Sequence, residues 1–276
     1  MVLAAAALAP LAAHAQRVER VFPADSDTAV EIRNFVGQIK VHGWSQPQVK
    51  IVALRKTQAV EPHIELKANR VYLHTHELGA SSAPASDRIV DYEVWAPPET
   101  QLDVRLESGS VLIENFTEDV RVSTAAASVS IHRLDGYSTV GTLSGGIEAE
   151  ACAGRVEITT VSGTVWFRAN ESRNLVAGST SGDIFYAGDA PRGASYEFRT
   201  NSGNIEITLP ANASFELNAR SVEGEVRNDF LLTPRMHGRP APTPGNALRS
   251  SSGTVSTGDA LIRATSFSGT IRLRKR

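Results

Sequence analysis

The chain has 276 residues, of which 41% are hydrophobic and 21% charged, so a wholly disordered protein is excluded. Its formal net charge of -2 excludes the strong basic excess of a general nucleic-acid-binding protein. The single cysteine, Cys152, excludes an intramolecular disulfide, a thiolate zinc site and a cysteine-ligated iron–sulfur cluster. Aromatic residues make up only 6%, so we expect a core built mostly from aliphatic side chains.

Residues 1–15 are expected to be a secretory signal peptide, cleaved between Ala15 and Gln16. The segment is apolar and uncharged, and it ends in the A-x-A pattern Ala13-His14-Ala15. It is shorter than the roughly 20 apolar residues that span a bilayer, and no later segment is long and apolar enough to do so. Its missing basic n-region indicates a start further upstream or a trimmed chain; a buried N-terminal helix is the alternative. The segment predicts export to the periplasm, the cell surface or the extracellular space.

The rest of the chain repeats a short motif, Ser-Gly followed two residues later by Val or Ile. We call the glycine position the pivot. From Gly109 to Gly224 successive pivots are 18 to 21 residues apart, and the next two gaps are 29 and 16 residues. The pivots, including two degenerate copies and one early copy, are Gly37, Gly109, Ala127, Gly145, Gly163, Gly182, Gly203, Gly224, Gly253 and Gly269.

Hydrophobic residues alternate with period two on both sides of the pivot, which is typical of strands that bury one face. The residue two positions after the pivot is always β-branched, as in Val165 and Ile184. The apolar positions lie an odd number of residues before the pivot and an even number after it. A glycine bulge or corner must therefore shift the register, so each unit is predicted to be strand, corner, strand and turn.

Units of this length cannot bury a core alone and must stack. We therefore predict an all-β, parallel β-solenoid with rungs of about 18–21 residues. A β-sandwich is the alternative, although it would not require constant spacing. Residues 16–100 are expected to form a less regular, β-rich N-terminal part. Residues 101–276 are expected to form the regular repeats, with a Pro-rich loop at 233–247.

With these rungs in view, the sequence resembles a bacterial family named "putative adhesins" (domain of unknown function 4097). The matching segments are 34–41, Gly43-Trp44, 49–51, 90–94 with Pro97-Pro98, and the serial Thr-x-Ser-Gly-x-Ile/Val units. The resemblance covers nearly the whole chain after residue 15. It implies an exported protein of β-strand repeats, and it supplies no catalytic residues that could be transferred.

No catalytic residue, metal site or cofactor is expected. Some β-helices cleave polysaccharides with two carboxylates in a cleft. Asp183, Glu206 and Glu225 follow the pivot on successive units, but their outward positions favour solvated side chains. The Ser-Gly pairs do not match the G-x-S-x-G elbow of serine hydrolases. A glycan-cleaving β-helix enzyme is therefore kept only as the alternative function.

Three histidines are a weaker candidate for a metal site. His74 and His76 share one face of a strand, and His63 is expected on a neighbouring strand. Two-residue spacing suits a metal ion, but the sequence identifies no third ligand. Solvated histidines are therefore the preferred interpretation.

Two surface features are candidate ligand-binding sites. Trp166 and Phe185 occupy the outward position three residues after the pivot on adjacent rungs, so their rings should lie side by side. Arg199, Arg220 and Arg249 occupy the outward position four residues before the pivot and should form a basic ladder. Glu197 could pair with Arg199, and an anionic glycan could bind instead.

We therefore predict a non-enzymatic, adhesin-like binding or scaffolding protein of the bacterial envelope. Its expected partner is an envelope glycan or another envelope protein, not a nucleic acid.

Overall fold

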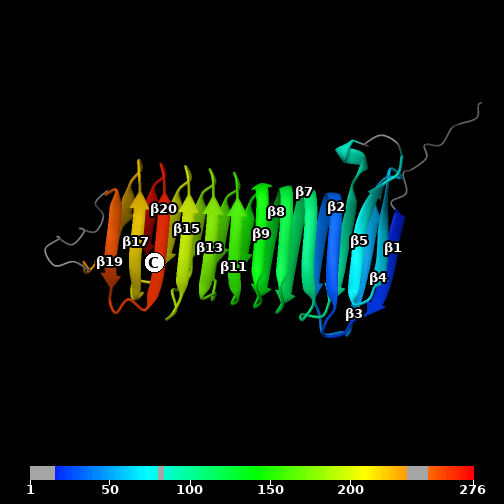
Figure 1. The fold of residues 1–276 in the computed structure, drawn as a ribbon, viewed down its shortest axis with the longest axis horizontal. Helices are drawn as coiled ribbons and strands as arrows, with labels where there is room; N and C mark the ends of the chain where they lie inside the picture. Colours follow the sequence, from blue (N-terminus) through cyan, green and yellow to red (C-terminus); the bar gives the residue numbers. More distant parts are fainter. Residues whose placement is uncertain (1–15, 80–83, 235–247) are drawn as a thin grey trace, which may run out of the picture.

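The computed structural model describes residues 16–79, 84–234 and 248–276. The predicted signal peptide, with Ala15, and most of the predicted Pro-rich loop lie outside the described residues. The described residues form 21 strands of one continuous sheet, and the helical content among them is the single 3-10 turn η1 (Ala85–Asp87). The strands stand side by side along a long axis that runs perpendicular to them (Figure 1). This arrangement confirms the predicted all-β parallel solenoid.

Each rung contributes one segment to each of two facing walls, the first wall before the pivot and the second wall after it. Three strands bend at the pivot and belong to both walls: β2 (Ala29–Gly43), β7 (Gln101–Phe116) and β8 (Val120–Leu134). The other parallel strands of the first wall are β5 (Arg70–Glu77), β9 (Ser138–Ser144), β11 (Arg155–Thr160), β13 (Asn174–Ser179), β15 (Ser195–Thr200), β17 (Phe215–Ser221) and β20 (Ala260–Ser266). Those of the second wall are β6 (Val90–Ala96), β10 (Ile147–Glu150), β12 (Val165–Arg168), β14 (Ile184–Ala187), β16 (Ile205–Leu209), β18 (Val226–Asn228) and β21 (Ile271–Lys275).

Antiparallel strands close both ends of the solenoid. β4 (Val60–Lys67) pairs with β5 at one end of the first wall, and β19 (Ser250–Val255) pairs with β17 at the other. On the second wall β3 (Gln48–Arg55) pairs with β6, and β1 (Gln16–Pro23) pairs with β3. Three of the four wall edges are thus covered by strands of opposite direction, whereas β18 at the fourth has, among the described residues, a single antiparallel bridge, from Val226 to Leu248.

The order of the rungs along the axis differs from their order in the sequence. β20 lies between β15 and β17, and β21 lies between β16 and β18. Figure 1 shows β20, in red, between yellow and orange strands. At the other end, β2 lies between β7 and the rung formed by β5 and β6. The rung formed by β2 and the rung formed by β20 and β21 therefore each have another rung on both sides.

One expected pivot needs correction. Gly253 lies on β19, which is antiparallel to its neighbour β17, so it belongs to no parallel rung. A Cβ on Gly253 would meet the carbonyl oxygen of Thr233 and not that of another pivot. The motif fits this segment because a period-two pattern does not encode the direction of a strand.

Most other pivots stack directly on one another. A Cβ on Gly163 would lie 1.8 Å from the carbonyl oxygen of Gly145, and a Cβ on Gly182 would lie 1.9 Å from that of Gly163. Glycine is needed at these positions because the neighbouring backbone occupies the space of a side chain. At Gly145 a positive φ of 118° adds a second requirement for glycine.

A Thr or Ser three residues before the pivot holds many of the corners. The hydroxyl oxygen of Thr160 accepts a hydrogen bond from the N–H of Gly163 at 2.9 Å, and Thr200 does the same for Gly203 at 3.0 Å. These side chains are buried, so the bond satisfies a polar group that water does not reach. Equivalent bonds join Ser179 to Gly182, Ser221 to Gly224 and Ser266 to Gly269.

The core between the walls is mostly aliphatic, but its middle rungs hold an aromatic cluster. The rings of Phe167, Tyr186, Tyr196 and Phe198 lie 5.1 to 6.4 Å apart, and all four residues are buried. Burial raises the pKa of both tyrosines. The Tyr196 hydroxyl donates to the carbonyl oxygen of Ser172 at 3.0 Å, so the phenol is not left unsatisfied. The core therefore includes large aromatic side chains beside the aliphatic ones expected from the composition.

Candidate functional site

Trp166 and Phe185 form a stacked pair on the outer face of the second wall. The two residues are direct partners on β12 and β14, and their ring centroids lie 4.0 Å apart at an interplanar angle of 12°. Trp166 is 37% exposed although it is one of the largest apolar side chains of the chain. The common offset from the pivot placed both side chains correctly, because β12 and β14 are neighbours in sequence and in space.

Charged side chains flank the aromatic pair. Arg168 lies with its guanidinium carbon 5.1 Å from the centre of the Trp166 ring and pairs with Glu148 at 3.0 Å. Glu148 lies on β10 and Phe185 on β14, the two neighbours of β12, so Arg168 reaches over Trp166 on the side away from Phe185. Glu206 is the neighbour of Phe185 on the next strand, β16, and it pairs with Arg274 at 3.4 Å. The pair therefore presents its partly exposed rings to a partner between charged neighbours.

A second aromatic cluster lies on the same wall near its N-terminal end. The ring of Trp95 lies 5.8 Å from that of His42 and 6.4 Å from that of Trp44, and the Lys50 ammonium lies 5.4 Å from its centre. The chain has three tryptophans, and all of them are partly exposed. Sequence reasoning missed this cluster because Trp44 and Trp95 meet only through the insertion of β2 beside β6.

The predicted basic ladder is wrong as an uninterrupted row. Thr265 of the inserted strand β20 lies between Arg199 and Arg220. Arg249 precedes the antiparallel strand β19 and donates a hydrogen bond to the carbonyl oxygen of Val222. Arg199 pairs with Glu197, as the sequence suggested. The spacing from the pivot was right for Arg199 and Arg220, but the order of the rungs separates them.

The three carboxylates considered for glycan cleavage are held in separate surface interactions. Asp183 accepts hydrogen bonds from the backbone and side chain of Asn204 at 2.7 and 3.1 Å. Glu225 pairs with Arg227 at 2.7 Å, and its rung is separated from that of Glu206 by β21. The side chains do not face one another across a cleft, as a pair of catalytic carboxyls would.

The serines of the repeated Ser-Gly pairs have a structural role. Four of their hydroxyls donate to a backbone carbonyl oxygen of the preceding rung, over distances of 3.2 to 3.4 Å. The residues are Ser144, Ser162, Ser181 and Ser202.

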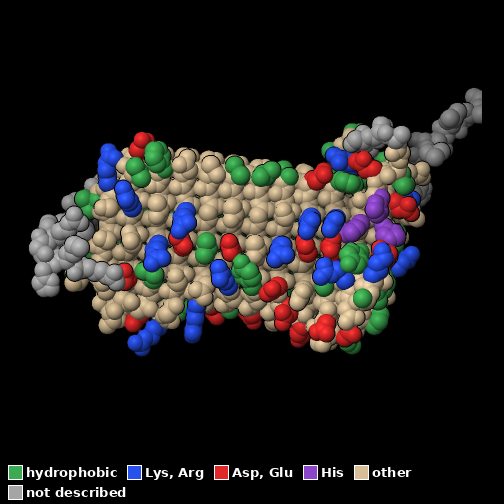
Figure 2. Space-filling model, viewed as in Figure 1, with side chains coloured by type: hydrophobic (Ala, Val, Ile, Leu, Met, Phe, Trp, Pro, Cys, Tyr) green, Lys and Arg blue, Asp and Glu red, His purple; other side chains and the backbone are tan. Residues whose placement is uncertain are grey.

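The three histidines gather at the N-terminal end of the first wall, over β4 and β5 (Figure 2). The ring of His76 lies 5.8 Å from that of His63 and 6.4 Å from that of His74. Within residues 16–79, 84–234 and 248–276 there is no group of three or more His, Cys, Asp or Glu side chains arranged to hold a metal ion.

The histidine cluster borders a buried carboxylate. Burial would raise the pKa of Glu31, but the charge of Arg33 and hydrogen bonds from His74 and Arg33 outweigh it, so this pKa is lowered. Burial lowers the pKa of His74, and the charge of Arg33 acts in the same direction. His74 lies 3.4 Å from Glu31.

Comparison with known proteins points to one family. Residues 28–274 match the family model described as Toastrack DUF4097. A "putative adhesin" from Bacteroides fragilis matches with a TM-score of 0.51 and 13% identity over 96% of this chain and 99% of that one, which shows a common fold. A "putative cell adhesion protein" from Clostridium sporogenes matches with a TM-score of 0.30 and 9% identity over 95% of this chain and 100% of that one. No curated protein matches this chain.

Proposed function

This chain belongs to the Toastrack DUF4097 family, and from that premise we propose that it is a non-enzymatic, adhesin-like binding module of the bacterial envelope. The Bacteroides fragilis protein that shares its fold is named a "putative adhesin", which supports a surface role. The apolar segment before Gln16 supports export to the periplasm, the cell surface or the extracellular space. No helix in the described part of the chain has the length and apolar character of a membrane span.

The observation that carries the proposal is the exposed Trp166–Phe185 pair. Tryptophan and arginine are enriched where proteins bind partners, because they combine a large contact area with a hydrogen-bonding group. Here Trp166 is packed between Phe185 and Arg168, so its position is fixed before a partner arrives. A preordered side chain loses little conformational entropy on binding, which favours affinity.

The two aromatic clusters of the second wall support a partner with an extended contact surface. Trp95 lies on β6 and Trp166 on β12, five strand spacings apart along the second wall. At about 4.8 Å per spacing this is roughly 24 Å. A surface glycan or a partner envelope protein can span that distance, and a rigid solenoid keeps the two clusters in register.

A pull-down from envelope fractions and a panel of envelope glycans tests the proposal. Wild-type protein is expected to retain a glycan or a protein that the double variant Trp166→Ala, Phe185→Ala loses. Tyr137→Ala is the matched control, because Tyr137 is also aromatic and also 37% exposed. Equal retention by wild type and double variant would rule out the aromatic pair as the binding site.

A further inference from the structure

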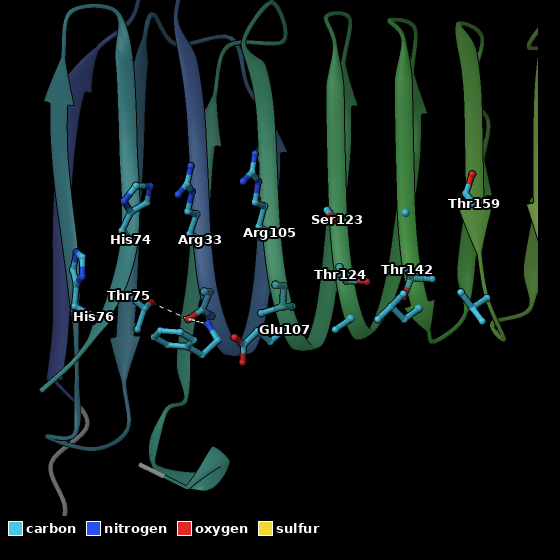
Figure 3. A pocket seen from close by; sticks show the side chains of 17 residues that line it. Arg33, His74, Thr75, His76, Arg105, Glu107, Ser123, Thr124, Thr142 and Thr159 are labelled. Carbon is cyan, nitrogen blue, oxygen red and sulfur yellow. Dashed lines mark hydrogen bonds between the residues drawn. The ribbon is translucent and has the colours of Figure 1, made fainter. Parts of the chain in front are cut away.

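A groove with a volume of about 810 Å³ runs along the outer face of the first wall, beside the pivot corners. It extends across β5, β2, β7, β8, β9 and β11, from His74 and His76 at one end to Thr159 and Val161 at the other (Figure 3). Six strands at about 4.8 Å spacing give it a length of roughly 24 Å. The groove lies on the wall opposite to the Trp166–Phe185 pair.

The two rows of side chains that line the groove differ in character. The row four residues before the pivot has large basic side chains at one end, Arg33 and Arg105. The next two positions, Ser123 and Gly141, have a small side chain and none. The loss of side-chain volume at these positions hollows the groove. The row two residues before the pivot carries Phe35 and Glu107 near the basic end and apolar side chains beyond them, and the most exposed of its apolar members are Leu143 at 61% and Val161 at 45%.

Two arginines stand side by side at the basic end. Arg33 and Arg105 are register partners on adjacent strands, and both side chains are about half exposed, at 51% and 52%. They point the same way along their strands (Figure 3). Like charges in this position repel one another unless an anion lies between them.

Acidic neighbours occupy only part of each guanidinium. Glu31 contacts Nη2 of Arg33 at 2.6 Å, and Asp103 accepts from Nε and Nη2 of Arg105 at 3.4 and 3.3 Å. A guanidinium has five N–H donors, and Nη1 of both arginines has no partner among the described residues. The Nη1 groups of both arginines can therefore donate to an anion, and hydrogen bonds between charged groups are stronger than neutral ones.

We propose that this groove binds a long-chain fatty acid. The carboxylate lies between Arg33 and Arg105, and the aliphatic chain follows the groove over Gly141 towards Leu143 and Val161. One basic position followed by apolar side chains complements a ligand with one charged end, whereas a glycan would need polar groups along its whole length. Glu107, 55% exposed in the row two residues before the pivot, disfavours a second anionic group there.

Titration calorimetry with the purified full chain tests the proposal, with dodecanoate below its micelle concentration as the probe. Dodecanoate is expected to bind saturably with one site per chain. Octanoate should bind roughly tenfold or more weakly, because it buries fewer methylene groups. Arg105→Gln should weaken dodecanoate binding by roughly tenfold or more, since it removes a charge-assisted hydrogen bond. Dodecanol, which lacks the charge, should bind weakly and with the same affinity to both proteins.

The apolar half of the site is tested by Leu143→Ser with Val161→Ser, which should weaken both dodecanoate and dodecanol. Val222→Ser is the matched control, because Val222 occupies the same offset from its pivot on a distant rung and is 38% exposed. It should bind like wild type. Thermal unfolding confirms that each variant is folded. Absent saturable binding of dodecanoate, or equal losses in the Val222 control, would overturn the proposal. Binding of dodecyl phosphate without dodecanoate would show that a fatty acid is the wrong ligand.

Discussion

The α-carbon of Gly163 faces the carbonyl oxygen of Gly145 so closely that a Cβ on Gly163 would lie 1.8 Å from it. The contact repeats along the solenoid, where Gly182 faces Gly163 and Gly203 faces Gly182. The repeated glycine therefore sets the distance between rungs at the corner. It is a packing requirement as much as a conformational one.

Replacement of Gly163 by alanine should destabilise the protein by several kcal/mol, because backbone atoms of two rungs must move apart. Chemical denaturation followed by circular dichroism measures the change. Gly178→Ala is the matched control: Gly178 lies within β13, and a Cβ there would meet nothing within 4 Å. It should leave stability unchanged or raise it by about 0.5–1 kcal/mol, since glycine loses more entropy on folding. Equal losses in both variants would contradict the stacking argument.

Thr160→Val should lower the free energy of unfolding by about 1–3 kcal/mol. Valine keeps the shape of threonine but removes the oxygen that accepts the Gly163 N–H, so a buried donor stays unsatisfied. The neighbouring exposed Thr159→Val should change stability by less than about 0.5 kcal/mol. Urea unfolding of both variants distinguishes these outcomes, and a neutral Thr160→Val would show that the hydroxyl does not hold the corner.

Ala169→Gly should raise stability by about 0.5–1 kcal/mol. Ala169 adopts a positive φ of 46° at the opposite corner of its rung, a conformation that glycine takes without steric cost. Ala187→Gly, at the end of β14 and without a positive φ, should lower stability by a similar amount. Thermal melts of the two variants should therefore shift in opposite directions.

Cys152 should not react with a thiol reagent in the folded protein. The side chain is fully buried, and burial raises the pKa of the thiol to about 11, so almost no thiolate is present near neutral pH. Ellman's reagent should label Cys152 only after denaturation, whereas a Thr159→Cys variant should be labelled at once. Rapid labelling of native wild type would show that this region opens.

Acidification should destabilise the protein through His74 and Glu31. The folded pKa of His74 lies below its ordinary value of 6.5, so its contribution to stability is complete above that value and is lost as pH falls towards the folded pKa. Glu31 also has a lowered pKa, so its contribution is complete above 4.5 and is lost as pH falls further. Melting temperatures at about pH 7.5 and about pH 5 should differ less for His74→Gln than for wild type. A larger difference in melting temperature for His74→Gln than for wild type would contradict the lowered pKa of His74.

The rungs and their inward and outward faces could be predicted from the sequence because both follow from period-two alternation around a fixed pivot. The aromatic pair was predictable for the same reason: Trp166 and Phe185 have the same offset from their pivots, and their rungs are neighbours both in the sequence and in the stack. The prediction of a basic ladder was wrong because Arg199 and Arg220 have the same offset from their pivots but do not lie on neighbouring rungs; β20 lies between their strands. An offset fixes the face of a side chain, whereas the neighbour depends on the order in which rungs stack.

The groove and the Trp44–Trp95 cluster could not be predicted for a related reason. Both include β2, which is paired with β5 or β6 on one side and β7 on the other. These pairings join segments distant in the chain, and no local pattern specifies them. The gaps of 29 and 16 residues were the one sequence signal that stacking order changes near the C-terminal end.

The interior position of β21 has a mechanical consequence. A strand at the end of a solenoid can be peeled away one hydrogen bond at a time, but β21 is bonded to β16 on one side and β18 on the other. A force applied through β21 along its length must therefore shear two parallel interfaces at once. A protein that holds two surfaces together would resist tension applied through β21 better with this arrangement than with β21 at the tip of the solenoid.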